Sequence, residues 1–356
     1  MKNSIGVSGD KQIYGASATK ENTVLLVLCL LLVGIVLGSL TVGRYSLPLD
    51  QLLEILKQRL FHGAVSAENQ RSAVVLFVVR IPRILLAMMV GACISVAGAS
   101  YQGLFRNPMI SPDILGASSG AATGAVIALI LDWSSYAVQL LSFTFGILAV
   151  CLVLFITKVM SKSSNSLLVM ILTGTVVSSI FQGITSLMKY VADTSEKLPA
   201  ITYWLLGSFA RTSNSRDIFT LFVVMLIGMT PLFFLRYRLN VLSFGDEEAR
   251  SLGVNVQQTR YIIMSCATLM TAASVSMCGI ISWIGLIIPH ICRMLVGPNY
   301  RALLKTSIVM GGLFMVMVDN FARVILPGEI PIGVLTSLIG APLFLSMLYR
   351  ERRSIQ

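Results

Sequence analysis

The chain has 356 residues, of which 55% are hydrophobic and only 12% are charged, and its mean hydropathy is +0.82. Soluble globular domains carry about 25% charged residues, so this composition excludes an ordinary soluble domain. The formal net charge of +11 comes from basic residues scattered near the ends of apolar runs. That distribution is typical of a membrane protein with basic loops and argues against a nucleic-acid partner.

Apolar runs of membrane-crossing length recur along the whole chain. A helix needs about 20 apolar residues to cross a bilayer, and its backbone groups must be bonded within the helix because lipid offers no partners. We therefore predict an all-α, polytopic membrane protein of about ten transmembrane helices. The expected spans are 24–43, 80–105, 113–131, 136–158, 166–190, 217–236, 260–280, 284–297, 302–322 and 332–349.

Polar segments flank these spans at both ends of the chain. Residues 1–23 are predicted to be a polar cytoplasmic tail, residues 24–350 the transmembrane domain, and residues 351–356 a second cytoplasmic tail. The first apolar run ends without a small-residue cleavage pattern, so we interpret it as a retained span and not as a removed signal peptide. An even number of spans would place both tails on the same side.

Three segments depart from the pattern of simple spans. The amphipathic segment 48–70 is expected to lie along the membrane surface. The apolar segment 198–211 is too short to cross, so we expect a re-entrant or interfacial helix with Trp204 near the headgroups. The segment 284–297 is short and contains Pro289, which suggests a broken helix packed inside the protein.

Small residues are expected to serve packing. Gly116, Gly120 and Gly124 lie four residues apart and would let two helices approach closely, a role that we favour over direct contact with a solute. The six cysteines lie in or beside apolar runs without paired metal-ligand spacing, so they are predicted to be core residues outside any metal site. They are Cys29, Cys93, Cys151, Cys266, Cys278 and Cys292.

Enzyme chemistry finds little support. Residues 116–120 read GASSG, the pattern of a nucleophile elbow, but the start of a membrane helix lacks the strand that this motif requires. An intramembrane serine protease would need Ser118 activated by His290, and it is the alternative from another class of protein. The sequence contains no phosphate-binding loop, so this polypeptide is not expected to hydrolyse ATP by itself.

Acidic residues are expected only near span ends. They are Asp113, Asp132, Asp193, Asp319 and Glu329. Ion-coupled carriers, the second alternative, keep ionisable groups deep in the membrane along the ion pathway. We therefore disfavour ion coupling and expect the energy for transport to come from a partner.

The largest internal polar insert, at about 241–259, is predicted to be a docking helix. Ser243 is expected to cap it together with Asp246 in a capping box, and Gly253 to end it in a left-handed conformation. Its exposed apolar contacts are expected to be Val241, Leu242, Phe244 and Leu252, which would form a surface for a partner. The residues predicted to couple it to an ATPase are Ser243, Gly245, Asp246, Glu247, Glu248, Ala249, Arg250, Leu252 and Gly253.

Three arginines are expected at the opposite face. Arg80 and Arg83 project from one side of a helix that Pro82 can begin, and Arg323 follows the ninth span. Guanidinium groups suit the recognition of carboxylates, so we predict that another protein docks there. Anchoring of the single arginines at the membrane interface is the alternative interpretation.

These segments resemble the FecCD-type permease family, the membrane subunits of ABC importers for ferric siderophores, haem and cobalamin. The resemblance runs from about residue 25 to the C-terminus and rests on several motifs in the same order. They are RIPR at 80–83, GASYQGLFRNP at 98–108, SPDILGASSG at 111–120, WLLGS at 204–208, EARSLGV at 248–254, GLIIPHICR at 285–293, EIPIG at 329–333 and IGAP at 339–342.

The resemblance implies a homodimer in the cytoplasmic membrane of a prokaryote, with two cytoplasmic ATPase subunits and an extracytoplasmic binding protein. It implies that the 241–259 insert seats in the ATPase and that Arg80, Arg83 and Arg323 meet acidic residues of the binding protein. The solute path would follow the dimer axis, lined by the fifth and tenth spans. ATP and Mg²⁺ would be bound by the ATPase, and no cofactor by this chain. The expected solute is a ferric siderophore, with cobalamin or haem as alternatives.

Overall fold

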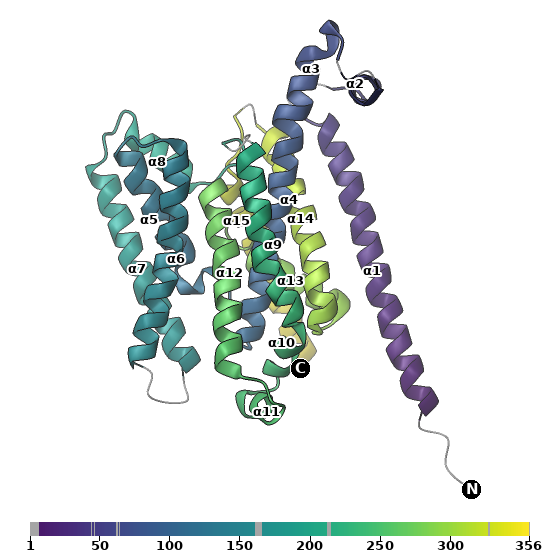
Figure 1. Cartoon of the computed structure of the whole chain (residues 1–356), viewed down its shortest axis with the longest axis vertical. Helices are drawn as coiled ribbons and strands as arrows, with labels where there is room; N and C mark the ends of the chain where they lie inside the picture. Colours follow the sequence, from purple (N-terminus) through teal and green to yellow (C-terminus); the bar gives the residue numbers. More distant parts are fainter. Residues whose placement is uncertain are drawn as a thin grey trace.

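A computed structural model describes residues 7–43, 45, 47–61, 63, 65–160, 166–211, 215–326 and 328–355. This part of the chain forms a bundle of helices (Figure 1). In chain order they are α1 (Val7–Thr41), α2 (Leu49–Phe61), α3 (Gln70–Val74), a π-helical turn (Val75–Arg80), α4 (Ile81–Leu104), α5 (Ala117–Ile130), α6 (Ser135–Met160), α7 (Ser166–Val191), α8 (Lys197–Leu205), α9 (Ser215–Phe234), α10 (Arg236–Leu242), α11 (Asp246–Ser251), α12 (Val256–Cys278), α13 (Ile284–Val296), α14 (Tyr300–Val324) and α15 (Ile332–Ile355).

The prediction of an all-α membrane protein is confirmed. Seven described helices are long and apolar enough to cross a membrane, and the apolar part of α5, α13 and α15 adds three shorter candidates. Each predicted span corresponds to one of these ten helices. α1 already begins at Val7, inside the segment predicted as a tail, and α15 continues to Ile355. Residues 1–6 and 356 of the predicted tails lie outside the described residues, and the division into tails and membrane domain stays a prediction.

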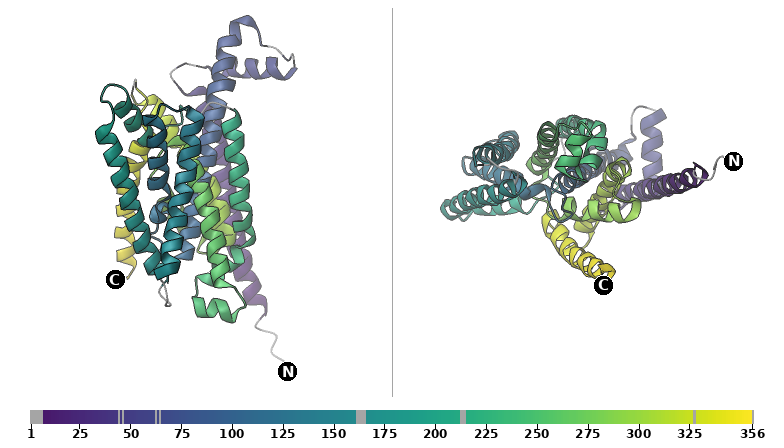
Figure 2. Two further views of the ribbon diagram at one scale, coloured as in Figure 1. Left: turned by 60° about the vertical axis from the view of Figure 1, so that its left-hand side comes forward. Right: turned by 90° about the horizontal axis from the view of Figure 1, so that it is seen from below.

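The bundle has two distinct ends, which we name the α2 end and the α11 end after the helices that lie there. The described chain begins and finishes toward the α11 end, whereas α2, α3 and α8 lie at the α2 end (Figures 1 and 2). The helix order therefore places the insert around α11 and the first turn of α4 on opposite sides of the molecule.

Two of the ten helices, α5 and α13, are half-helices that begin near the middle of the bundle. A Cβ on Gly285 would lie 2.4 Å from Pro112 Cγ and 3.0 Å from the carbonyl oxygen of Ile94, which is near the midpoint of α4. Both half-helices follow a residue with positive φ, +79° at Gly116 and +72° at Trp283. Such a φ is uncommon outside glycine, and it turns the chain sharply into each helix.

The half-helices then run in opposite directions. α5 ends at the α2 end, because Lys197 of α8 binds the carbonyl of Ile130 at 2.6 Å, and α13 leads to the α11 end, where Asn240 binds the backbone NH of Tyr300 at 2.9 Å. The helices α4 to α7 therefore form one repeat, in which a long helix is followed by a short one and two long ones. The helices α12 to α15 form a second repeat of the same order that runs in the opposite direction. Inverted repeats of this kind are typical of transporters.

α4 forms the centre of the bundle, and nearly all its residues are buried among α12, α13 and α14. Its backbone touches α14 directly, because a Cβ on Gly91 would lie 2.1 Å from the carbonyl oxygen of Gly311. The packing role predicted for Gly120 and Gly124 is also confirmed. A Cβ at either position would lie within 2.4 Å of a carbonyl oxygen of α6.

Two sequence predictions were wrong in detail, and a third stays a prediction. Trp204 is buried, because α8 packs against α5, and Arg211 lies 5.8 Å from the Trp204 ring, whereas its expected level near the headgroups stays a prediction. α13 continues through Pro289, so the interruption lies before Ile284 and not at the proline. Cys151 is exposed and Cys29 half-buried on apolar helices, whereas the other four cysteines are buried as predicted.

Candidate functional site

The docking insert predicted at about 241–259 contains the end of α10, a sharp turn, the short helix α11 and the start of α12. Gly245, with φ of +144°, precedes α11, and such a φ favours glycine. The predicted capping box is wrong, because the Ser243 hydroxyl donates to the carbonyl of Asn240 at 2.6 Å instead. Gly253 has φ of +77° and ends α11 in the left-handed conformation, as predicted.

Asp246 attaches α11 to two membrane helices. Its carboxylate pairs with Arg260 of α12 at 2.8 Å and with Arg106, which follows α4. Charge-assisted bonds of this kind are stronger than neutral ones and fix geometry. A displacement of α11 would therefore be passed to the ends of both α4 and α12.

The outer face of this insert combines exposed apolar and charged side chains. Phe244 is 74% exposed and Leu252 59% exposed. Val241 and Leu242, also predicted to be exposed, are instead buried residues of α10. Glu247, Glu248 and Arg250 face outward, and the buried Ala249 holds α11 on the bundle. Large exposed apolar side chains with a charged rim mark a protein-binding surface.

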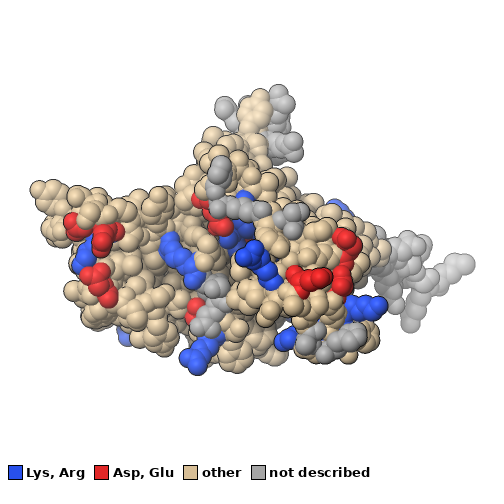
Figure 3. Space-filling model, turned by 90° about the horizontal axis from the view of Figure 1, so that it is seen from above, with Lys and Arg blue, Asp and Glu red and all other residues tan. Residues whose placement is uncertain are grey.

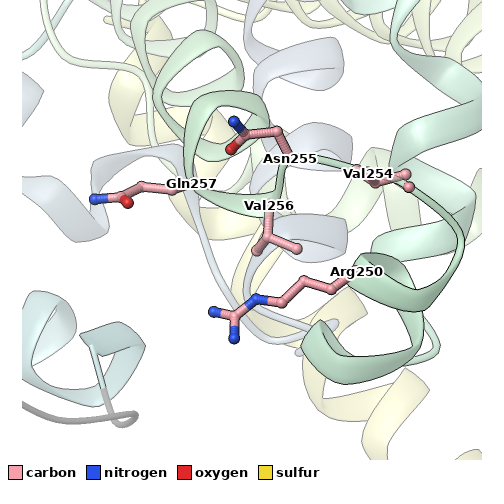
Figure 4. A pocket seen from close by; sticks show the side chains of 6 residues that line it. Arg250, Val254, Asn255, Val256 and Gln257 are labelled. Atoms are coloured by element: carbon pink, nitrogen blue, oxygen red, sulfur yellow. The ribbon is translucent and has the colours of Figure 1, made fainter.

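A shallow hollow of about 430 Å³ adjoins α11. It is lined by Arg250 and by residues 253–257, which connect α11 to α12. Figure 4 shows the Arg250 side chain extending from α11 toward Val256 and Gln257. The surface at the α11 end therefore has both a hollow beside Arg250 and the projecting side chains of Phe244 and Leu252.

The three arginines at the α2 end are buried and bonded within the chain. Arg83 binds Asp319 of α14 through its Nε at 2.9 Å and Glu329 at 3.0 Å. Arg323 forms a second ion pair with Asp319 at 3.2 Å and donates to Ser39 of α1 at 2.7 Å.

Arg80 completes this buried group by donating to the carbonyl oxygens of Leu40 and Tyr45, at the end of α1 and just beyond it. We name Arg80, Arg83, Asp319, Arg323 and Glu329 the arginine cluster. It links α1, α4, α14 and the segment that leads into α15. The predicted docking role of the arginines stays a prediction, but their guanidinium groups already have partners in this chain. Figure 3, which views the α2 end, shows small groups of basic and acidic side chains, some of them adjacent, among uncharged residues.

The depth of Asp113 differs from the sequence prediction. It follows Pro112, which packs at the midpoint of α4, so its carboxylate lies well inside the bundle and not near a span end. The hydroxyl of Ser118 donates to this carboxylate. The sequence signal was the pair of prolines at 108 and 112, because no α-helix continues across them and Pro112 begins only a short 3-10 turn, Pro112–Leu115, before Gly116.

Ser118 therefore lacks the surroundings of a nucleophile. Its hydroxyl donates to the carboxylate of Asp113, just before its own helix, and not to His290, the base that the protease interpretation requires. Among the residues that the structure describes, no three His, Cys, Asp or Glu side chains are grouped so that they could hold a metal ion.

The fold and these two ends define a polytopic membrane protein of the transporter class. The FecCD transport family model matches residues 29–350, and the chain belongs to that family. It is accordingly the permease subunit of an ABC importer, a transport protein and not an enzyme.

Known relatives differ in the solutes that their names give. The chain is 41% identical to the molybdate import permease MolB of Haemophilus influenzae, over 93% of this chain and 96% of that protein. It is 37% identical to an iron chelatin transport permease of Helicobacter pylori, over 87% and 93% of the two chains. It is 31% identical to the hemin permease HmuU of Yersinia pestis, over 91% and 95%.

A solved structure confirms the architecture. A metal-chelate type ABC transporter in an inward-facing conformation superposes with a TM-score of 0.82 at 40% identity, covering 92% of this chain and 99% of that one. The fold predicted from the sequence is thus shown both by the helices themselves and by this likeness.

Proposed function

We propose that this chain is half of a homodimeric permease in the cytoplasmic membrane of a prokaryote, with its α11 end and both termini in the cytoplasm. The family and the solved relative support the importer class. The orientation is supported by Arg236, Arg238, Arg301 and Lys305, which lie at the α11 end, because basic residues favour the cytoplasmic side.

The single observation that carries the mechanism is the exposed insert at the α11 end. A separate ATPase, which binds ATP and Mg²⁺, seats on Phe244, Leu252 and the hollow beside Arg250. Its closure on ATP moves α11, and Asp246 passes that displacement to α4 and α12. Charge reversal at both Glu247 and Glu248 would weaken the contact and lower copurification of the ATPase with the permease. Copurification and transport at wild-type levels would contradict this assignment.

The solute path is proposed to run between two copies, along α7 and α15. α7 exposes a row of uncharged polar side chains at helical spacing, Thr175, Ser179, Gln182 and Ser186. Thr175 and Ser179 bond to their own helix, and Gln182 reaches Ser119 of α5 at 3.4 Å. A membrane helix that is polar on an exposed face suits a path through which a hydrated solute passes.

An extracytoplasmic binding protein is proposed to dock at the α2 end. Arg83 is the best placed of the three arginines, because one of its partners, Glu329, is 33% exposed while the other, Asp319, is 1% exposed. A carboxylate of the binding protein would compete with Glu329 and leave the bond to Asp319 in place.

The proposed solute is a ferric chelate of the siderophore type, with haem or cobalamin as chemically similar cargo. The uncharged polar row on α7 accommodates a metal that is already wrapped by its own ligands. Molybdate is the second candidate, and the 41% identity to MolB is the observation that favours it. Hydroxyl and amide donors also suit an oxyanion.

The test is uptake into proteoliposomes that contain the permease with its ATPase and binding protein. Labelled ferric siderophore, haem, cobalamin and molybdate are compared with and without ATP. We expect ATP- and binding-protein-dependent accumulation of one of them. Uptake driven by an ion gradient without ATP would contradict the importer mechanism. Accumulation of molybdate alone would show that the solute is molybdate and not a ferric chelate.

A further inference from the structure

The helix α2 lies across the α2 end of the bundle and not along the bundle axis. Figures 1 and 2 show it perpendicular to α4 and displaced beyond the other helices. It is joined to α4 by α3 and the π-helical turn, which continue the α4 axis upward. α2 is therefore held at a fixed height, parallel to the plane in which a membrane surface would lie.

The contacts of α2 show which way each of its faces points. Leu52 and Ile55 are buried against Ala73 and Leu76. Gln51 donates to Asn69 at 3.1 Å, and the side-chain oxygen of Gln58 accepts from the backbone NH of Ser66 at 3.0 Å. Residues 66 and 69 lie farther from the bundle than residues 73 and 76, so the glutamines mark the face that points away from the bundle.

An exposed leucine row occupies the opposite flank. Successive residues are about 100° apart around a helix, so the row lies next to Leu52 on the side away from the glutamines. It therefore faces back toward the level of the membrane-spanning helices. Its members are 38% to 78% exposed and comprise Leu49, Leu53, Leu56 and Leu60.

The neighbouring helix indicates that this level is the edge of the apolar layer. Val74 and Val78 are each about half exposed and extend the lipid-facing surface of α4 upward. Just above them the exposed side chains become charged, at Glu68 and Arg71. The exposed side chains change from apolar to charged at the height of Ser72. Gln51 of α2 lies at the same height, because its Nε2 donates to the Ser72 hydroxyl at 3.1 Å.

The charged residues of α2 are placed in agreement with the direction that the leucine row faces. Lys57 and Arg59 flank the leucine row, one on each side. Asp50 lies on the same side as Lys57, Arg59 also donates to the carbonyl oxygen of Gly63 at 3.1 Å, and Glu54 lies on the face that points away from the bundle. Cations beside an apolar row match the phosphate groups of lipids, and Glu54 is kept in water.

We propose that α2 is a membrane-surface helix, whose leucine row enters the lipid leaflet at the α2 end while Lys57 and Arg59 bind anionic lipid headgroups. A second copy of the chain is the less suitable occupant, because α2 lies on the α1 side of the molecule, away from α7 (Figure 2). Resting on the lipid, α2 fixes the height of α3 and of the π-helical turn that ends at Arg80.

The test is a depth measurement on the full chain in lipid nanodiscs. The half-buried thiol of Cys29 and the exposed thiol of Cys151 are removed by Cys29→Ser and Cys151→Ser. An environment-sensitive fluorophore is attached after Leu53→Cys or, as the matched control, Glu54→Cys. Lipids with a spin label near the headgroup serve as quenchers. We expect about threefold stronger quenching at position 53 than at position 54, as for a helix with one face in the interface.

Charge is tested in the same preparation. Lys57→Gln with Arg59→Gln should lower the quenching at position 53 about twofold in anionic phosphatidylglycerol discs and leave it unchanged in zwitterionic discs, because each cation contributes only near a charged surface. Equal quenching at positions 53 and 54 would overturn the proposal. The proposal would also be overturned if the fluorophore at position 53 became shielded only on addition of a second copy or of the binding protein and was not quenched by spin-labelled lipid. Neither measurement depends on transport. A failure of the membrane-surface proposal can therefore be distinguished from a failure of the proposed import function.

Discussion

The two ends of the bundle differ in whether their charged residues are buried or exposed. At the α2 end, Arg80, Arg83 and Arg323 are buried, and their bonds go to the chain's own carboxylates and carbonyl groups. At the α11 end, Phe244 and Leu252 project into solvent next to exposed charges. Both ends were predicted from the sequence to dock partners. In the single chain the predicted docking residues Phe244 and Leu252 of the α11 end are exposed, whereas the arginine cluster is buried and holds helices together.

The largest effect is expected from removing the shared carboxylate of the cluster. Asp319→Ala takes from the buried Arg83 and Arg323 the carboxylate that they share, which leaves Arg83 with Glu329 and Arg323 with uncharged partners only. Breaking a buried ion pair costs about 3–5 kcal/mol. The free energy of unfolding, measured by denaturant titration in detergent, should fall by that amount. Glu329→Ala is the control, because a partly exposed ion pair contributes under about 1 kcal/mol. Equal losses for the two variants would show that the cluster is not a buried support.

The next largest effect concerns the exposed apolar side chains at the α11 end. Phe244→Ala combined with Leu252→Ala should weaken ATPase binding by about 2–3 kcal/mol, since buried aromatic anchors dominate interfaces. The stability of the permease should not change, because both side chains are exposed. Titration of the ATPase against permease in nanodiscs measures the loss. Leu326→Ala, an exposed leucine at the other end, should bind normally, and equal binding by the double variant would refute the docking surface.

A smaller effect is expected where α11 is attached to the bundle. Asp246→Asn removes the charge that pairs with Arg106 and Arg260 while keeping the side-chain shape. The ATPase should still bind, but transport per ATP hydrolysed should fall about tenfold, a coupling loss of roughly 1.4 kcal/mol. The ratio of uptake to phosphate release in proteoliposomes gives this quantity. Asp132→Asn, which breaks a pair with Lys197 at the α2 end, should leave the ratio unchanged.

The smallest effect tests whether the arginine cluster also takes part in docking. Glu329→Gln leaves Arg83 with one carboxylate, so its affinity for an acidic binding protein should rise about threefold at low salt and lose that gain at high salt. Surface plasmon resonance on immobilised nanodiscs can resolve this change. An affinity that is independent of residue 329 at both salt concentrations would confine the cluster to its structural role.

The membrane helices could be predicted from the sequence because long apolar runs in lipid must be helical. The site was only partly predictable, because burial depends on contacts between distant segments. Arg83 meets Asp319 across 236 residues, so the sequence revealed the arginines but not their partners. Asp113 was placed too near a span end, because its apolar neighbours hide the re-entrant chain before Gly116. The stop signal at Gly253 was local and was predicted correctly, whereas the cap at Ser243 and the exposure of Val241 and Leu242 were not.

The contacts of α4 with α13 and α14 constrain how this permease can change shape. A Cβ on Gly98 would lie 1.7 Å from the carbonyl oxygen of Gly285, and one on Gly91 would lie 2.1 Å from that of Gly311. Because these backbones are in direct contact, we expect α4, α13 and α14 to move together as one block. Alternating access would then consist of motion of α7 and its neighbours against this block, and an alanine at Gly91 or Gly98 would force its members apart.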